Sequence, residues 1–154
     1  MNSSISLDSA GTSMDLHISN VLTESVSLYP FIRSIGEQLH LTQELVSSIA
    51  IAVEEQVMNV IRYAYPRGEE GTITLRARWK HRSGILKFTL IDHGVAFNPT
   101  APAEEAGTER PLGAIGINML SQLMDTVDYV RRAGYNILHF TKRITLNFNL
   151  SHPS

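Results

Sequence analysis

Three polar side chains are predicted to share one face of a helix near the middle of the chain. In the segment VEEQVMNVIR, residues 53–62, a rotation of about 100° per residue places Glu55, Asn59 and Arg62 within about 60° of one another. A carboxylate, an amide oxygen and a guanidinium together could hold a hydrated metal ion and a phosphate, and Mg²⁺ prefers oxygen ligands. The alternative is an ordinary solvated helix face.

A second motif follows an apolar run in LIDHGVAFNP, residues 90–99. Asp92 ends a predicted strand, and a carboxylate there can accept a strong hydrogen bond from an exocyclic amine. Gly94 lets the backbone approach a flat ring that a side chain would block. Because Asp and Gly are also the default turn residues, a plain turn is the alternative.

A third motif is glycine-rich. In RPLGAIGINMLSQLMD, residues 110–125, Gly113 and Gly116 flank the predicted start of a helix. Free backbone N–H groups and the positive end of the helix can bind a phosphate there without a side chain. The segment lacks the Gly-Lys-Ser/Thr of a P-loop and the preceding strand of a Rossmann fingerprint. Taken alone, the two glycines equally fit an ordinary helix start.

The spacing of apolar residues predicts the elements that carry these motifs. Helical periodicity favours a helix over 23–39 and a longer one over 43–64, with Thr42 as its N-cap and Pro66 as its stop. Alternation favours strands at the following places: around Leu16 and Ile18, over 72–80 and 85–91, and over 126–132 and 136–145. Between them, 98–113 is predicted to be a long loop and 116–124 a third helix.

This order predicts an α+β fold, a two-layer sandwich with three helices on one face of a mostly antiparallel mixed sheet. The predicted boundaries are a flexible N-terminal tail over 1–13, one domain over 14–148 and a C-terminal tail over 149–154.

Composition narrows the class of protein. The chain has 154 residues, 43% of them hydrophobic and 18% charged, which suits one domain with a real core. A net charge of −2 argues against a nucleic-acid binder, and the absence of cysteine excludes disulfides and thiolate metal sites. No apolar run approaches the ~18 residues that span a membrane, and the N-terminus lacks signal-peptide character. We therefore expect a cytoplasmic protein.

The order and spacing of the three motifs resemble the Bergerat-fold ATP-binding domain of gyrase-type topoisomerases, heat-shock chaperones of the ninety-kilodalton class and histidine kinases. Within that superfamily the chain looks most like the small anti-sigma-factor serine kinases. The segments that carry the resemblance are IAVEEQVMNVIRYAYP, DHGVAFNP and LGAIGINMLSQLMDTVDYVRRAGYNILHFTKRI, and it extends from residue 14 to about 146. The last segment includes the Gly134-x-Asn136 hairpin typical of that group.

The resemblance implies ATP and Mg²⁺ as ligands and gives each motif a role. Glu55 would be the general base toward a substrate serine, and Asn59 would ligate Mg²⁺ between the phosphates. Arg62 is counted with the nucleotide-binding residues on the same helix face. Asp92 would accept from the adenine amine, with Gly94 lining the base.

The resemblance also implies a mobile lid over the triphosphate, formed by residues 98–112. Gly113 and Gly116 would hold phosphate oxygens on backbone N–H groups, and Arg110 is the candidate for the γ-phosphate. Three positions depart from the usual pattern. Ala96 and Ala114 stand at nucleotide-binding positions where relatives often have Gly, and Tyr63 stands where these kinases commonly have His.

Two functions therefore compete. The first is a serine protein kinase that sequesters a sigma-type factor and phosphorylates an anti-anti-sigma antagonist. The second is a nucleotide-dependent protein-binding module without kinase turnover, in which Glu55 would be dispensable. A histidine kinase fragment and a domain without a ligand are further alternatives. Neither nucleic acid nor a membrane is expected as a partner, and a homodimer through the first strand and helix is left open.

Overall fold

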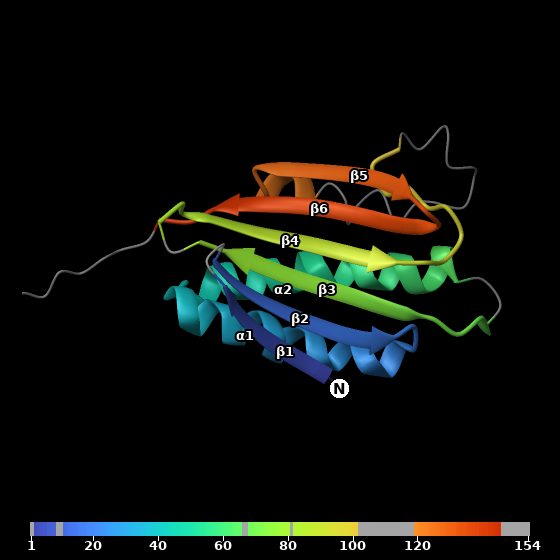
Figure 1. Cartoon of the computed structure of the whole chain (residues 1–154), viewed down its shortest axis with the longest axis horizontal. Coiled ribbons are helices and arrows are strands. Elements are labelled where there is room, and N and C mark those ends of the chain that lie inside the picture. Colours follow the sequence, from blue (N-terminus) through green and yellow to red (C-terminus); the bar gives the residue numbers. More distant parts are fainter. Residues whose placement is uncertain (1, 9–10, 66–67, 81, 102–118, 146–154) are drawn as a thin grey trace, which may run out of the picture.

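The chain forms a sheet with helices covering one of its faces (Figure 1). The computed structural model describes residues 2–8, 11–65, 68–80, 82–101 and 119–145. The six strands run in the spatial order β1-β2-β3-β4-β6-β5. Their bounds are β1 Asn2–Asp8, β2 Gly11–Ser19, β3 Thr72–Trp79, β4 Ile85–Asp92, β5 Thr126–Arg132 and β6 Tyr135–Arg143. The predicted two-layer α+β architecture is confirmed, and each pairing between these strands is antiparallel, so the sheet is not a mixed one.

The central strands alternate as the sequence predicts. Along β3, Ile73, Leu75, Ala77 and Trp79 are buried while their neighbours are exposed or half-buried. Period-two alternation of this kind places one face of the sheet against the helices. The turn between β5 and β6 contains Ala133 and Gly134 at φ of 50° and 82°, which is the left-handed geometry that a tight hairpin needs.

The first helix begins later than predicted. Residues Leu22–Ser27 form a 3-10 helix, η1, and the α-helix α1 spans Leu28–Leu39. Pro30 explains the difference, because a proline is tolerated in the first turn of a helix but breaks its interior. The predicted apolar stripe is confirmed: the buried face of α1 includes Leu28, Phe31, Ile32, Ile35 and Leu39.

The second helix changes its winding before it ends. The α-helix α2 spans Gln43–Asn59, and residues Val60–Ala64 continue it as a π-helix, η2. Thr42 is the predicted N-cap, and its hydroxyl accepts a hydrogen bond from the backbone N–H of Leu45 at 3.2 Å. Periodicity alone predicted one uninterrupted α-helix over 43–64, because a switch in hydrogen-bond spacing leaves no periodic signal.

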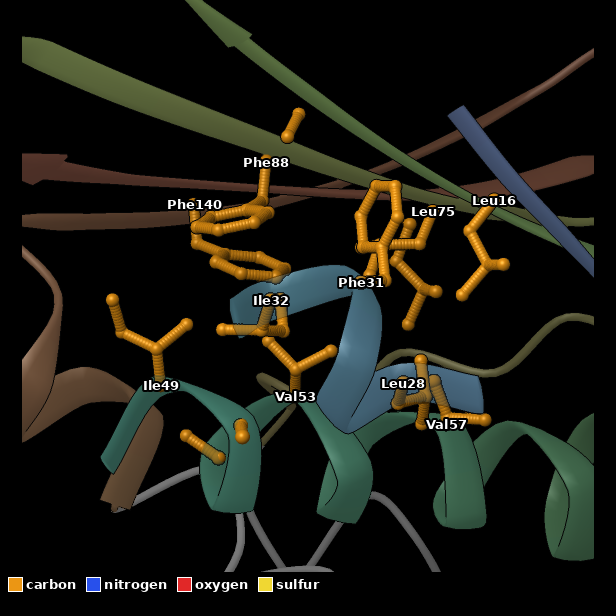
Figure 2. Close-up of a cluster of buried hydrophobic side chains, with 14 of the residues drawn as sticks. Leu16, Leu28, Phe31, Ile32, Ile49, Val53, Val57, Leu75, Phe88 and Phe140 are labelled. Carbon is orange, nitrogen blue, oxygen red and sulfur yellow. The ribbon is translucent and has the colours of Figure 1, made fainter. Parts of the chain in front are cut away.

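The core lies between α2 and the sheet. Figure 2 shows Ile49 and Val53 rising from α2 toward Phe88 and Phe140 of the sheet. The two phenyl rings come from the adjacent strands β4 and β6 and stack with centroids 5.2 Å apart. This packing fixes α2 over the middle of the sheet, and with it every polar side chain that α2 carries.

The N-terminal residues differ from the flexible tail that was predicted for them. Instead of a flexible tail over 1–13, Asn2–Asp8 form the edge strand β1, which pairs along its length with β2. The side chain of Ile5 is 58% exposed, so at that position the backbone ladder and not apolar burial holds the strand. A serine-rich strand that is held by backbone hydrogen bonds has little hydrophobic pattern, so its sequence does not predict a strand. The predicted tail over 149–154 lies outside the described residues.

Of the third predicted helix, 116–124, residues 119–123 are described and are helical. Within the described ranges, no helix combines the length and apolar character needed to cross a bilayer.

Candidate nucleotide site

Asp92 ends β4 in a buried hydrogen-bonded position. Its side chain is only 3% exposed, and its Oδ1 accepts from the Asn136 amide at 2.8 Å and from the Gly94 backbone N–H at 3.0 Å. Burial raises the pKa of Asp92, while the hydrogen bonds from Asn136 and Gly94 and the charge of Arg131 oppose the rise. Among the described residues both of these bonds fall on Oδ1, which leaves Oδ2 to accept from a ligand.

Asn136 organises the surroundings of Asp92 from the facing strand. It stands opposite Asp92 in the β4–β6 register, and its Oδ1 accepts from the Tyr129 hydroxyl at 2.7 Å and from the Arg131 guanidinium at 3.0 Å. Its Nδ2 also donates to the carbonyl of Val95. From its sequence context Asn136 is only a hairpin residue, because its role depends on the strand pairing.

Arg131 is a further residue whose role sequence reasoning missed. Its Nη1 donates to the carbonyl of Gly94 at 2.8 Å as well as to Asn136. A charged residue beside a hairpin turn is most simply a solvated tip, and nothing in the local sequence distinguishes this one. Here the guanidinium joins β5 to the turn that follows Asp92.

The three polar residues that were predicted to share one helix face lie on α2 and η2. Asn59 is 1% exposed, and neither atom of its amide has a hydrogen-bond partner among the described residues. Glu55, one turn earlier, is half-buried, and Arg62 is exposed on η2. An unpaired buried amide costs about 1–3 kcal/mol, so a residue kept in that state calls for a functional explanation. Within the described residues, the Asn59 amide therefore keeps its hydrogen-bonding capacity for a ligand.

A small cavity separates α2 from the end of β4. Its walls come from α2, η2, the end of β4, the turn after it, β5 and β6: Gln56, Val60, Leu90, Asp92, Phe97, Pro99, Tyr129, Asn136 and Leu138. The structure therefore brings the second helix and Asp92 to one cleft, but the side chain of α2 that lines it is Gln56 and neither Glu55 nor Asn59. The volume is about 10 Å³, which is room for one water molecule.

Aromatic side chains border this cavity. Phe97 lies in its wall and stacks on Tyr63, with ring centroids 5.3 Å apart and planes 19° from parallel. A nucleobase therefore enters only if Phe97 or its neighbours move. Tyr63, which stands where the anti-sigma-factor serine kinases commonly have His, thus packs behind a residue of the cavity wall.

Gly94 has a packing role that the sequence analysis did not foresee. A Cβ at this position would overlap the carbonyl oxygen of Ala64, the last residue of η2. The same carbonyl accepts from the backbone N–H of Val95 at 2.8 Å. The turn after β4 is therefore docked on the end of η2, and this contact fixes the distance between Asp92 and the polar face of the helix. Ala96, the next predicted site residue, is exposed.

Several predicted site residues cannot be compared with the structure. Arg110, Gly113, Ala114 and Gly116 lie outside the described residues, as does the part of the predicted lid from residue 102 onward.

A larger cavity lies elsewhere among the described residues. It measures about 470 Å³ and is lined by the beginning of β2, the end of β3 and the beginning of β4, with Arg78, Lys80 and Lys87 contributing positive charge. Because β4 starts at this cavity and ends at Asp92, the two sites lie at opposite ends of that strand. The larger cavity contains none of the residues that the three motifs single out.

A family comparison identifies the class of domain to which the chain belongs. Residues 22–142 match the family described as the histidine kinase-like ATPase domain. The chain belongs to this family. Membership implies ATP binding, and it confirms the predicted histidine kinase-like fold.

Solved structures support the same fold for this histidine kinase-like ATPase domain. The RsbU and RsbW domains of Rv1364c from Mycobacterium tuberculosis superpose with a TM-score of 0.60 at 18% identity, over 84% of this chain and 32% of that one. The histidine kinase domain of the blue-light activated kinase EL346 from Erythrobacter litoralis gives 0.52 at 16% identity, over 78% of this chain and 60% of that one. The chain thus spans about a third of the mycobacterial structure. No curated protein matches it.

Proposed function

We propose that the chain binds Mg-ATP with the adenine at Asp92, transfers the γ-phosphate to a serine of an anti-anti-sigma antagonist, and sequesters a sigma-type factor. The observation that carries the proposal is the buried, unpartnered amide of Asn59, one helical turn after Glu55 and on the helix that faces Asp92. The partner classes follow the resemblance to anti-sigma-factor serine kinases and the RsbW domain named for the mycobacterial structure.

Recognition of adenine rests on Asp92. Asn136 and Gly94 donate to Oδ1, and Oδ2 would accept from the exocyclic amine. A carboxylate is a stronger acceptor for an amine than a neutral group is. The apolar walls of the cavity, among them Val60, Leu90 and Leu138, suit the faces of a flat base.

Phosphoryl transfer rests on the polar face of α2 and η2. The described residues hold no cluster of three or more His, Cys, Asp or Glu for a metal ion, so Mg²⁺ would rely on Asn59, phosphate oxygens and water. When bound there, Mg²⁺ neutralises charge on the transferring phosphate. Glu55 takes the proton from the substrate serine, and the exposed Arg62 adds positive charge beside the phosphates.

A nucleotide-dependent binding module without turnover is the second candidate. The observation that favours it is the small volume of the cavity beside Asp92. Because Phe97 or its neighbours must move to admit a base, nucleotide binding changes the surface around residues 97–99. A partner could recognise that change without any transfer of phosphate, and Glu55 would then be dispensable.

Phosphotransfer from radiolabelled ATP separates the two functions. We expect Glu55→Ala to lower the rate of serine phosphorylation by about a hundredfold or more, since a general base contributes that much, while ATP binding persists. Glu54→Ala is the matched control, because Glu54 is the residue before Glu55 and its side chain is exposed on another face of α2.

The kinase proposal fails if Glu55→Ala transfers phosphate as fast as the wild type. Binding of ATP by the wild type with no transfer to any antagonist would leave the binding module as the function.

A further inference from the structure

We propose that Gln56 is a base-reading residue, whose side-chain amide forms paired hydrogen bonds with the edge of the adenine that Asp92 holds. The inference rests on the proposed nucleotide site and adds to it a residue that none of the three motifs singled out. It makes the recognition of adenine depend on two side chains from opposite walls of the cleft, one on α2 and one at the end of β4.

The first observation is the state of the Gln56 amide. The side chain is 1% exposed, and neither Oε1 nor Nε2 has a hydrogen-bond partner among the residues that the structure places. Glutamine is rarely buried so completely, and a buried amide without partners destabilises the folded protein. An apolar residue of the same size would serve the core better, so stability does not account for glutamine at this position.

The second observation is where this amide lies. Gln56 lines the same cavity as Asp92 and Asn136, so its unused donor and acceptor stand in the wall of the cleft assigned to the base. Asn136 differs from Gln56 in that its amide is already bonded to Asp92, Val95 and Tyr129. Gln56 is therefore the amide in this wall with free hydrogen-bonding capacity for a ligand.

The chemistry of the two groups selects adenine. The exocyclic amine of adenine carries two hydrogens, one for the carboxylate of Asp92 and one for Oε1 of Gln56, and Nε2 can then donate to the adjacent ring nitrogen. A glutamine amide matches this donor and acceptor pair on adenine. Guanine presents a carbonyl oxygen in place of the amine, and that oxygen would face the carboxylate of Asp92.

A binding cycle between protein and ligand tests this pairing. The affinities of wild type and Gln56→Met are measured by calorimetry for ADP and for purine riboside diphosphate, which lacks the amine. We expect removal of the amine to weaken wild-type binding by about tenfold more than it weakens Gln56→Met, because the variant has already lost its partner. Gln43→Met, a substitution at the far end of α2, should behave as the wild type does.

Thermal unfolding without nucleotide gives an independent readout. Because Gln56→Met removes two unsatisfied buried groups at nearly constant volume, we expect its melting temperature to equal or exceed that of the wild type while its ADP affinity falls. A residue that served only the structure would lower both. Gln56→Leu provides the same comparison if the methionine variant does not fold.

The outcomes separate the inference from the proposed function. Suppose that the wild type binds ADP, and that removal of the amine weakens binding by the same factor in Gln56→Met as in the wild type. Gln56 then does not contact the amine and the inference is wrong, while the nucleotide site stands. If the wild type binds neither nucleotide, the proposed function and the inference fall together.

Discussion

The buried polar residues of the site are of two kinds. Asp92 and Asn136 bond to each other and to the surrounding backbone, so they form a preorganised end of the cleft. Gln56 and Asn59 are equally buried and have no partners within the described part of the chain. The first kind fixes geometry, and the second keeps hydrogen-bonding capacity for a ligand. The sequence motifs singled out one residue of each kind, Asp92 and Asn59. They missed Asn136 and Gln56, because strand pairing and burial in the folded chain are not visible in local spacing.

The charge of Asp92 leads to a pH prediction. A carboxylate accepts from the adenine amine, whereas a protonated carboxyl offers a hydrogen instead. Because burial raises the pKa of Asp92 above its ordinary 3.8, the carboxylate forms only as the pH rises through that higher value. We expect ATP affinity measured by calorimetry to increase with pH across this transition.

Asp92→Asn is the control for that titration. Its affinity for ATP should stay low and show no such step, because the amide does not ionise. A wild-type affinity that falls as the pH rises, or an asparagine variant with undiminished affinity, would contradict the role given to Asp92.

The junction between helix and strand positions the two halves of the site. The end of η2 accepts a hydrogen bond from Val95 through Ala64, and Gly94 allows the close approach. The sequence predicted both elements, since apolar spacing reports which face of each is buried. It did not predict the π-helical turn, because a switch in hydrogen-bond spacing leaves no periodic signal. Nor did it predict the contact between Ala64 and Gly94, because these two residues lie far apart in the chain.

An ion pair between β2 and β3 leads to a prediction about stability. Asp15 of β2 stands opposite Arg76 of β3, and the guanidinium forms two hydrogen bonds to the carboxylate at 2.8 and 2.7 Å. These bonds hold the pKa of Asp15 below its ordinary value of 3.8. We expect Arg76→Met to lower the free energy of unfolding at neutral pH by about 1 kcal/mol, the usual size for a well-oriented exposed or half-buried pair.

The sign of the pH effect follows from the lowered pKa. The contribution of Asp15 to stability is present above pH 3.8 and is lost as the pH falls through the lower pKa of the folded state. The free energies of unfolding of wild type and Arg76→Met should therefore converge in acid. Denaturant unfolding at several pH values measures this difference. Arg33→Met, which removes an exposed pair with Glu37, should change stability little. A difference between Arg76→Met and wild type that persists unchanged in acid would contradict the assignment.

The whole molecule presents a closed candidate site and an open cavity at opposite ends of β4. Composition and periodicity predicted the layers, the helices and most strands. The motifs led to the prediction that the polar face of the second helix and Asp92 look into one cleft. They did not predict β1, whose strand character comes from pairing with β2 and not from an apolar pattern. Nor could they predict that the smaller cavity, of about 10 Å³, contains Asp92 while the one of about 470 Å³ lies away from it.

A nuclear magnetic resonance titration of the labelled protein with Mg-ATP tests whether adenine nucleotide binds at the end of β4. We expect shifts concentrated at the backbone amides of Gly94 and Asn136 and at the side-chain amides of Gln56 and Asn59. Shifts confined to the opposite cavity, at Gly11, Trp79 and Ser83, or no shifts at all, would contradict it.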